Sequence, residues 1–498
     1  MRTGEREMTR ASVRSAATAM VTVAAVTLLA GCVSLAPRYR QPALPVPDAW
    51  PIAATTPAAT ANVAAIPAAT PAAADAVADI GWRDFFADPK LQQLIALALV
   101  NNRDLRVAVA TMERARSQYQ VQRADRLPSI DAAGTMVRQK ANYNIPGVFS
   151  GPATTTSYGV DVGVSAFELD LFSRVRNLSR GALERYLAQQ ESRRSVQLAL
   201  IADVASAWLA LASDRQLQKL AEETLAGQEN AYRLSQQRHD EGSISGLDLA
   251  QAQTTVESAR ADAARYEGNA ARDLNALTLL AGAPVDAALL PEVAEPLAGL
   301  APLPAQLPSQ VLLRRPDVLS AEHVLRAANA DIGAARAAFL PRISLTGSVG
   351  TASSELSGLF DSGTGVWSFT PRISLPLFQG GRLLGNLGGA RAGRDIAVAQ
   401  YEKAIQSGFR EVADALVLTG TLARQRQAQQ ALATATARVY ELSQERYKAG
   451  RDSYLAVLDA QRSSYAARQA LLAVQLSEQA NRVTLYKALG GGWRERSP

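Results

Sequence analysis

The feature that most constrains the fold is an internal repeat. Leu442 to Gln469 (LSQERYKAGRDSYLAVLDAQRSSYAARQ) has an earlier, looser copy at Leu234 to Ala261 (LSQQRHDEGSISGLDLAQAQTTVESARA). Each copy reads as a helix, a break centred on a glycine, and a second helix. The glycines are Gly242 and Gly450, and their separation of 450 − 242 = 208 residues is far longer than a solenoid unit. The chain is therefore a duplicated half.

Long runs without proline precede both glycines, from about Arg176 to His239 and from about Leu387 to Lys448. Each run can form a helix of roughly 60 residues, or about 90 Å at 1.5 Å per residue. After each glycine a shorter helix returns, to about Leu280 and Leu489. We expect two tall helical hairpins whose turns lie at one end of a tube.

A helical seam is apparent in the first long run, with apolar residues in steps of three and four as in coiled coils. Its residues are Leu198, Ile201, Ala205, Trp208 and Leu211. Such narrow, alanine-rich seams are too thin to fill a globular core, so we expect the helices to pack side by side.

The composition suits long helices, because aromatic residues make up only 6% of the chain. A net charge of +6 would permit nucleic-acid binding. However, the arginines alternate with acidic residues and glutamine along helices, which is typical of solvated helix faces, and we expect no nucleic-acid partner. Beyond residue 32 we expect no apolar run of about 18 residues, so a membrane crossing would have to use strands.

Residues 1–31 have the layout of a secretory signal peptide, with arginines ahead of an apolar run. The run ends in Leu29-Ala30-Gly31-Cys32, which resembles a bacterial lipobox. Cys32 is the only cysteine, so no intrachain disulfide can form, and we predict that it carries a covalent lipid. Val33 in place of Asp implies forwarding to the outer membrane. The alternative is a stray cysteine in an ordinary signal peptide, and either Met1 or Met8 can be the start.

A tether rich in proline and alanine follows, over residues 32–88. Asp88 can then cap a helix that has Pro89 at its first position and runs to about Arg126. The remaining organisation is a first structural repeat at 89–285, a Pro-rich linker at 286–307, a second repeat at 308–490 and a C-terminal tail at 491–498.

Period-2 alternation predicts two strands in each half. In the first half, Tyr158, Val160, Val162, Val164 and Ala166 share one side, and an earlier alternation runs from Ile130 to Val137. A loop rich in Gly, Pro and Asn separates the two. In the second half, alternations run from Ile343 to Gly350 and from Trp367 to Leu375. Apolar residues facing lipid and small or polar residues facing a lumen would give this pattern in a membrane barrel, and a half-buried soluble sheet would give it too.

Four strands cannot close a membrane barrel, because single-chain barrels start at about 8 strands. An open sheet edge in lipid leaves backbone groups without partners. We therefore predict a mixed fold: three chains share a trimeric 12-stranded β-barrel, with four strands per chain, continued by a long periplasmic α-helical barrel.

Several motifs then resemble one family. Leu312 to Val318 (LLRRPDV), Ala327 to Ala330 (AANA) and Ile332 to Pro341 (IGAARAAFLP) look like a hallmark of the TolC-like outer membrane factors, in the lipoprotein branch of efflux channels. Trp82 to Pro89 and Leu485 to Trp493 are similar to that branch as well. The likeness covers nearly all of the mature chain, although the low-complexity run at 51–79 is longer than the family usually carries.

The resemblance implies a homotrimer that acts as the outer-membrane exit duct of a tripartite efflux system. A periplasmic adaptor and an inner-membrane pump, expected to be of RND type, would supply drugs or other small molecules. The chain itself would do no chemistry and would need no cofactor besides the lipid on Cys32.

The resemblance also implies a periplasmic gate at Leu455, Asp459 and Arg462, through the match over Tyr454 to Arg462. Their i,i+4 and i,i+3 steps place them on one helix face, where three-fold symmetry would make an apolar ring and an acidic ring. The alternative is an ordinary seam leucine beside a solvated ion pair within the helix.

The turns from Gly242 to Ser245 and from Gly450 to Ser453 are the predicted adaptor-docking tip, with Gly242, Ser243, Gly450 and Arg451 as its candidates. The glycines can also serve simply as helix C-caps.

No other chemistry is indicated. His239 and His323 are the only histidines and have no ligands at metal-binding spacing, so we expect no metal. No phosphate-binding loop or nucleophile-base set is apparent, and a periplasmic lipoprotein enzyme ranks last. A surface-anchored coiled-coil scaffold or adhesin without a pore remains the main alternative to a channel.

Overall fold

The computed structural model describes residues 34–50, 80–145, 149–292, 300–301, 303 and 308–496. The predicted signal peptide (1–31), the predicted lipidation site Cys32, and residues 51–79 of the tether lie outside the described residues. So do 293–299, 302 and 304–307 of the linker and residues 497–498 of the tail.

The chain forms two compact units that are each assembled from several segments. The first contains the N-terminal segment up to Pro42, Met112–Gln189 and Ala321–Tyr401. The second contains Ala43–Thr111, Gln190–Ser320 and Glu402–Pro498. Each unit therefore takes segments from both predicted repeats.

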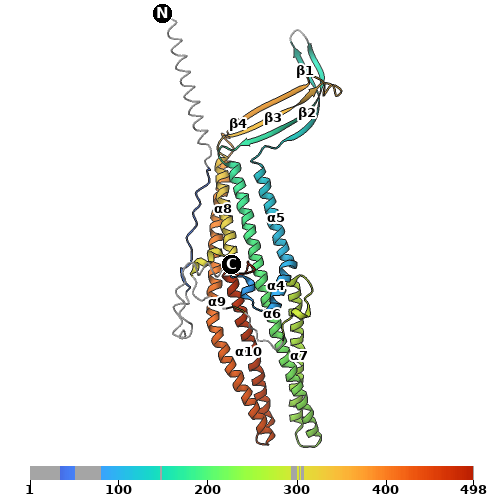
Figure 1. Cartoon of the computed structure of the whole chain (residues 1–498), viewed down its shortest axis with the longest axis vertical. Coiled ribbons are helices and arrows are strands. Elements are labelled where there is room, and N and C mark those ends of the chain that lie inside the picture. The colour runs from blue at the N-terminus through green and yellow to red at the C-terminus, as the bar shows by residue number, and fades with distance from the viewer. Residues whose placement is uncertain are drawn as a thin grey trace. The chain divides into compact units, whose positions relative to one another are not determined.

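The elements alternate between helices and strand pairs along the chain (Figure 1). The first half contains α3 (Trp82–Phe85), α4 (Pro89–Asn101), α5 (Arg103–Ala124), β1 (Asp131–Ile145), β2 (Phe149–Leu169), α6 (Arg174–Asp240) and α7 (Gly246–Ala281). Two 3-10 helices, η2 (Ala287–Leu289) and η3 (Ser309–Arg314), come next. The second half contains α8 (Pro316–Ala337), β3 (Arg342–Ser353), β4 (Gly365–Ser374), α9 (Arg382–Lys448) and α10 (Tyr454–Ala488).

The helices confirm the internal repeat. Both α6 and α9 have 67 residues, or about 100 Å at 1.5 Å per residue, and they start 382 − 174 = 208 residues apart. The starts of α7 and α10 are also 454 − 246 = 208 residues apart, which equals the glycine spacing. The return helices α7 and α10 have 36 and 35 residues, so the two helical hairpins are close structural copies of one another.

The predicted single helix from Asp88 to Arg126 is wrong, although its start is right. The Asp88 carboxylate accepts hydrogen bonds from the Lys90 and Leu91 amides and caps α4. The helix then ends at Asn102, whose backbone is extended. The Asn102 Oδ1 accepts the Leu105 amide at 2.9 Å and its Nδ2 donates to the Leu280 carbonyl, so this side chain caps a second helix, α5.

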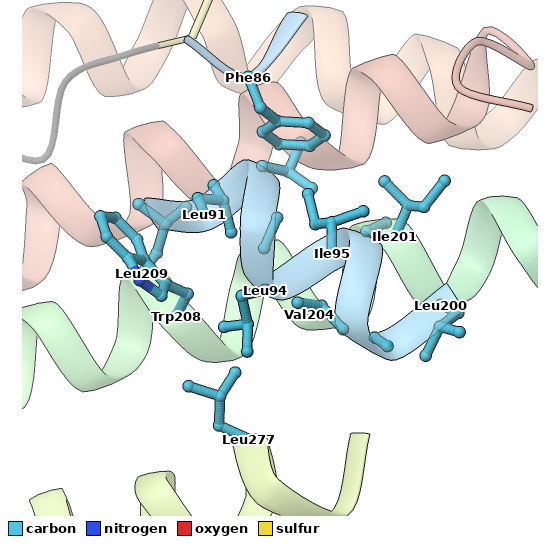
Figure 2. Packing of buried hydrophobic residues seen from close by; sticks show 14 of the residues in the cluster. Phe86, Leu91, Leu94, Ile95, Leu200, Ile201, Val204, Trp208, Leu209 and Leu277 are labelled. Atoms are coloured by element: carbon cyan, nitrogen blue, oxygen red, sulfur yellow. The ribbon is translucent and has the colours of Figure 1, made fainter. Parts of the chain in front are cut away.

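A hydrophobic core occupies the second unit (Figure 2). The predicted seam of α6 is buried there, but the buried stripe is wider than the seam and also includes Leu200, Val204 and Leu209. Leu91, Leu94 and Ile95 of α4 and Leu277 of α7 pack against it. We expected the helical seams to be too thin to fill a core. That expectation is wrong, because α4 adds its apolar residues to those of α6 and α7.

An aromatic group completes this core. The rings of Phe85 and Tyr486 stack with centroids 4.0 Å apart, and Phe86 meets both rings edge-on. The buried Tyr486 hydroxyl donates to the Ile80 carbonyl at 2.8 Å. Burial raises the pKa of Tyr486, so the phenol remains a hydrogen-bond donor. These contacts fix the Trp82–Phe85 helix to the end of α10.

One apolar stretch of α6 contradicts the expectation that no apolar run of about 18 residues follows residue 32. Helix α6 contains an 18-residue stretch long and apolar enough to span a membrane by composition, with a mean hydropathy of 1.6. More than half of that stretch is buried inside the protein. A core helix passes the same test, and the contacts of Ile201, Val204 and Trp208 with α4 are those of a core helix.

The Arg315-Pro316-Asp317 motif places a buried arginine between two partly exposed carboxylates in the second unit. The Arg315 guanidinium, whose side chain is 9% exposed, pairs with Asp317 at 2.7 Å and Glu411 at 2.9 Å. It also donates to the Ala488 carbonyl at 2.6 Å. A buried guanidinium needs several acceptors. Through these three contacts, Arg315 joins the start of α8 to α9 and to the C-terminal end of α10.

Candidate functional site: the four-stranded sheet and the hairpin turns

The four predicted strands form one antiparallel sheet in the first unit, in the order β1-β2-β3-β4. The β1-β2 hairpin is longer than predicted, because Asn142, expected in a loop, pairs with Pro152. A proline is tolerated there, because β2 before Tyr158 is paired on one side only. The predicted loop is thereby reduced to residues 146–148, which lie outside the described residues.

The register divides the sheet into two faces. Val162 is opposite Ala132 on one side and Val349 on the other, and Val349 is opposite Trp367. The face that carries these residues, here called the apolar face, contains Ala132, Gly134, Met136, Tyr158, Val160, Val162, Gly347, Val349, Trp367, Phe369 and Ile373. The two faces predicted from alternation thus extend across all four strands.

Among the described residues, no helix covers the apolar face. Val162 is 46% exposed and Trp367 is 79% exposed, and Phe369 and Ile373 are exposed as well. Soluble proteins rarely leave so contiguous an apolar surface open to water. The face therefore needs lipid or another apolar partner.

The opposite, polar face carries small and hydrophilic residues. Gly163, Ser348 and Ser368 are opposite one another across three strands, and the Ser348 and Ser368 hydroxyls lie 2.9 Å apart. A Cβ on Gly163 would lie 2.5 Å from the Gly347 carbonyl, and one on Gly350 would lie 2.1 Å from the Val160 carbonyl. The strands crowd together on this face, so we infer that the sheet curls toward it.

The strands β1 and β4 form the two edges of the sheet. Among the described residues, β1 pairs only with β2 and β4 pairs only with β3. A bulge between Val164 and Phe167 interrupts the predicted alternation, and Ala166 there has a φ of 52°. Within the described residues, the sheet is therefore open at both edges.

The hairpin turns of the second unit repeat one capping geometry. Gly242 and Gly450 have φ values of 71° and 68°. The Ser243 amide donates to the Arg238 carbonyl at 2.7 Å, and the Arg451 amide donates to the Arg446 carbonyl at 2.8 Å. Both are Schellman caps, which require a left-handed residue that glycine adopts without strain. The C-cap role predicted as the alternative for these glycines is therefore confirmed.

The two turns differ in how the helix that follows the glycine is capped. Ser245 begins α7 with a capping box, in which its hydroxyl accepts from the Asp248 amide and the Asp248 carboxylate accepts from the Ser245 amide. Ser453 begins α10 without a side-chain cap. Instead, Arg446 pairs with Asp452 across the second turn at 2.6 Å.

One contact joins the two turns, and the sequence did not predict it. The Arg238 Nη1 donates to the Tyr447 hydroxyl at 3.0 Å, and the Tyr447 ring lies 5.4 Å from that of Tyr454. Burial, with the nearby Tyr447 and Tyr440, raises the pKa of Tyr454. Figure 1 shows the turns of α6–α7 and α9–α10 at the same end of the second unit.

The predicted gate residues lie on one exposed face of α10. Leu455 is 51% exposed, and Asp459 and Arg462 are exposed, whereas Val457 and Leu458 face the protein interior. Within the described structure no ion pair joins Asp459 to Arg462, so the solvated intrahelical pair of the alternative interpretation is not formed. Both charges remain available to another molecule.

Each of the two histidines lies close to one oxygen atom of the protein. The His323 Nδ1 lies 2.7 Å from a Glu184 carboxylate oxygen, and the His239 Nδ1 lies 3.2 Å from the Ile244 carbonyl oxygen. Across the residues that the structure describes, no group of three metal-ligating side chains is present. The His323 contact joins α8 to α6, and the His239 contact lies in the turn between α6 and α7.

A family model described as outer membrane efflux protein matches residues 94–283 and 307–491. The antibiotic efflux pump outer membrane protein ArpC of Pseudomonas putida is 46% identical over 471 residues, covering 94% of each chain. The toluene efflux pump outer membrane protein TtgC of the same species has the same identity and coverage. The open state of the Neisseria gonorrhoeae MtrE outer membrane channel is 37% identical, with a TM-score of 0.78 over 94% of this chain and 100% of that one.

Proposed function

Because this chain belongs to the outer membrane efflux protein family, we propose that it is the exit duct of a tripartite pump. The observation that carries this proposal is a four-stranded sheet with one apolar and one polar face and two open edges. Only a closed wall satisfies such edges in lipid, and the polar face then lines a passage.

Three copies are the simplest closure. Four strands from each chain give 12, an even number that leaves room for an interior passage. The long helices support the same assembly, since apolar residues such as Leu432, Val439 and Leu442 of α9 are exposed in one chain. In a trimer those residues would pack against neighbouring helices and the three sets of hairpins would form one hollow cylinder.

The working partners would be a periplasmic adaptor and an inner-membrane pump of RND type. The duct conducts passively, while the pump supplies energy and selects the cargo. Relatives named for toluene and antibiotic efflux support small, partly apolar molecules as that cargo.

The adaptor would dock at the hairpin turns. Gly242, Ser243, Gly450 and Arg451 are exposed at the tips of the two hairpins, where the chain offers rigid caps and few packing contacts. Binding there would act directly on the Arg238–Tyr447 bond and so on the closure of the mouth.

The exposed face of α10 would form that mouth. Three-fold symmetry turns Leu455 into an apolar ring and Asp459 into an acidic ring, with Arg462 of a neighbouring copy as the partner that Asp459 lacks within its own chain. An acidic ring attracts cations and makes opening sensitive to pH. A diacylglycerol on Cys32 would anchor the N-terminal segment in the outer membrane.

Planar-bilayer recording with the purified mature protein tests the proposal. A duct gives discrete conductance steps, with low conductance while the mouth is closed and a rise when adaptor is added. A poreless scaffold or adhesin gives no current under either condition, and that result would overturn the channel function.

A further inference from the structure

A cavity in the first unit has no part in the conduction of cargo. Its volume is about 330 Å³, and it lies where the N-terminal segment crosses α6 and α8. Three arginines, Arg38, Arg180 and Arg326, contribute to its lining, against one carboxylate, Glu184. The AANA motif around Asn329 also lies at this cavity, and neither the gate nor the sheet makes use of it.

The N-terminal segment is fixed in place, so the cavity is preformed. The Ser34 hydroxyl donates to the Asn177 Oδ1 at 2.9 Å, and Arg336 donates to the Leu35 carbonyl at 3.0 Å. The Tyr39 hydroxyl donates to Glu322 at 2.8 Å. Side chains on both helices therefore hold the segment that forms one wall.

The charges of the lining are only partly balanced. Arg326 pairs with Glu322 at 2.6 Å, and Glu184 contacts His323 at 2.7 Å. In the described part of the chain, neither Arg38 nor Arg180 has an ion-pair partner. Two free guanidinium groups at one cavity favour an anion, and planar guanidinium groups match the oxygens of a phosphate.

A buried acceptor adds a second requirement. Asn329 lines the cavity and is only 8% exposed, yet its Oδ1 accepts no hydrogen bond from any described residue. The Arg326 Nε is also buried without an acceptor. Buried polar atoms are almost always paired in native proteins. A ligand that fits both must bring anionic oxygens together with a hydroxyl or ammonium donor.

The position of the cavity indicates the source of such a ligand. Ser34 is two residues from Cys32, and two residues span at most about 7 Å. If Cys32 carries the proposed diacylglycerol, the cavity lies at the depth of the phospholipid headgroups. We propose that it binds the headgroup of a phospholipid, with the phosphate on Arg38 and Arg180 and a headgroup hydroxyl donating to Asn329. This inference rests on the proposed lipidation for its position only.

Native mass spectrometry of the full-length protein in detergent tests the site, with dioleoylphosphatidylglycerol as the probe. The unmodified protein should bind up to one phospholipid per chain. The double variant Arg38→Gln with Arg180→Gln should bind it at least about tenfold more weakly, the scale of one lost charged contact. Because both side chains are exposed, these changes should leave the fold intact. Arg114→Gln with Arg391→Gln removes two exposed arginines of the same unit away from the cavity and should bind like the unmodified protein.

Glycerol 3-phosphate in place of the lipid distinguishes the two possible sources of the phosphate ester. Binding as tight as that of the lipid would overturn the membrane source, as would equal lipid affinity in the two double variants. The mass of the Cys32 adduct and the bilayer conductance are recorded on the same preparations. Intact conductance with no lipid at the cavity would refute this inference alone and leave the channel function standing.

Discussion

Arg238 and Tyr447 connect the two copies of the repeat across 209 residues of sequence, through a 3.0 Å hydrogen bond from the guanidinium to the phenol oxygen. The bond joins the last turn of α6 to the last turn of α9, and the guanidinium carbon lies 5.8 Å from the ring centroid. Within the described residues, no other hydrogen bond joins these two helix ends. We infer that it resists separation of the hairpin tips.

Replacing Tyr447 with Phe should therefore favour the open mouth. The change removes the hydrogen bond and keeps the ring, at a cost of about 0.5–1.5 kcal/mol per chain, since a charged donor is left without its acceptor. Single-channel recording should show an open probability raised several-fold. Tyr440→Phe is the matched control, because the Tyr440 hydroxyl bonds only to Gln444 on the same helix. An equal effect of both variants would contradict the role of the bond.

Removing the carboxylate of Asp459 should make the closed channel leak more ions. The change would remove the three proposed interchain pairs with Arg462, each worth about 0.2–1 kcal/mol at an exposed site, and so would weaken closure of the mouth. Closed-state conductance in planar bilayers checks this for Asp459→Ala. Glu267→Ala, which removes an exposed carboxylate of α7, should leave the leak unchanged. An unchanged closed-state conductance of Asp459→Ala would exclude Asp459 from the gate.

Asn102→Ala should lower stability without altering conductance. It removes the cap of α5 and leaves the Leu280 carbonyl without its donor, for a total of about 1–3 kcal/mol. Thermal unfolding followed by circular dichroism measures the loss. Asn101→Ala, which removes only a bond to the Leu97 carbonyl of the same helix, should cost less. Similar losses for both would show that Asn102 is not the cap on which the break depends.

A carboxyl pair on α6 and α7 should make stability depend on pH. Burial raises the pKa of Asp214, and burial together with the Asp214 charge raises the pKa of Asp273. The folded state therefore holds protons more tightly than the unfolded state, so the pair destabilises the fold as pH rises through the raised values. Asp273→Asn should stabilise the protein at pH 7, by about 0.2–0.5 kcal/mol, and not at pH 3, which is below the ordinary pKa of an aspartate. Chemical unfolding at both pH values measures this, and equal gains at both would contradict it.

The sequence predicted what depends on local pattern. Runs without proline located α6 and α9 within a few residues, and alternation assigned Val160 and Val162 to the correct face because side chains in strands alternate strictly. The family hallmark at Arg315 was recognised, and the membership it implied is confirmed. Its buried ionic contacts were not predictable, since Glu411 lies far away in sequence.

What the sequence missed depends on partners distant in the chain. Asn102 looked like an interior helix residue, because its acceptor, Leu280, comes from the end of α7. Asn142 and Pro152 looked like loop residues, because only pairing between strands shows that the hairpin continues. Tyr447 lies inside the repeated stretch without any predicted role, since its partner Arg238 lies in the other copy. The cavity beside Asn329 likewise forms only when the N-terminal segment crosses two helices.

The central claim is that three chains share one β-barrel. Its most direct test is the mass of the mature protein, solubilised in mild detergent and measured with the detergent contribution subtracted. One chain supplies four strands and leaves two edges unpaired, so the expected mass is that of three chains. A fully folded monomer at the same protein concentration would contradict the account.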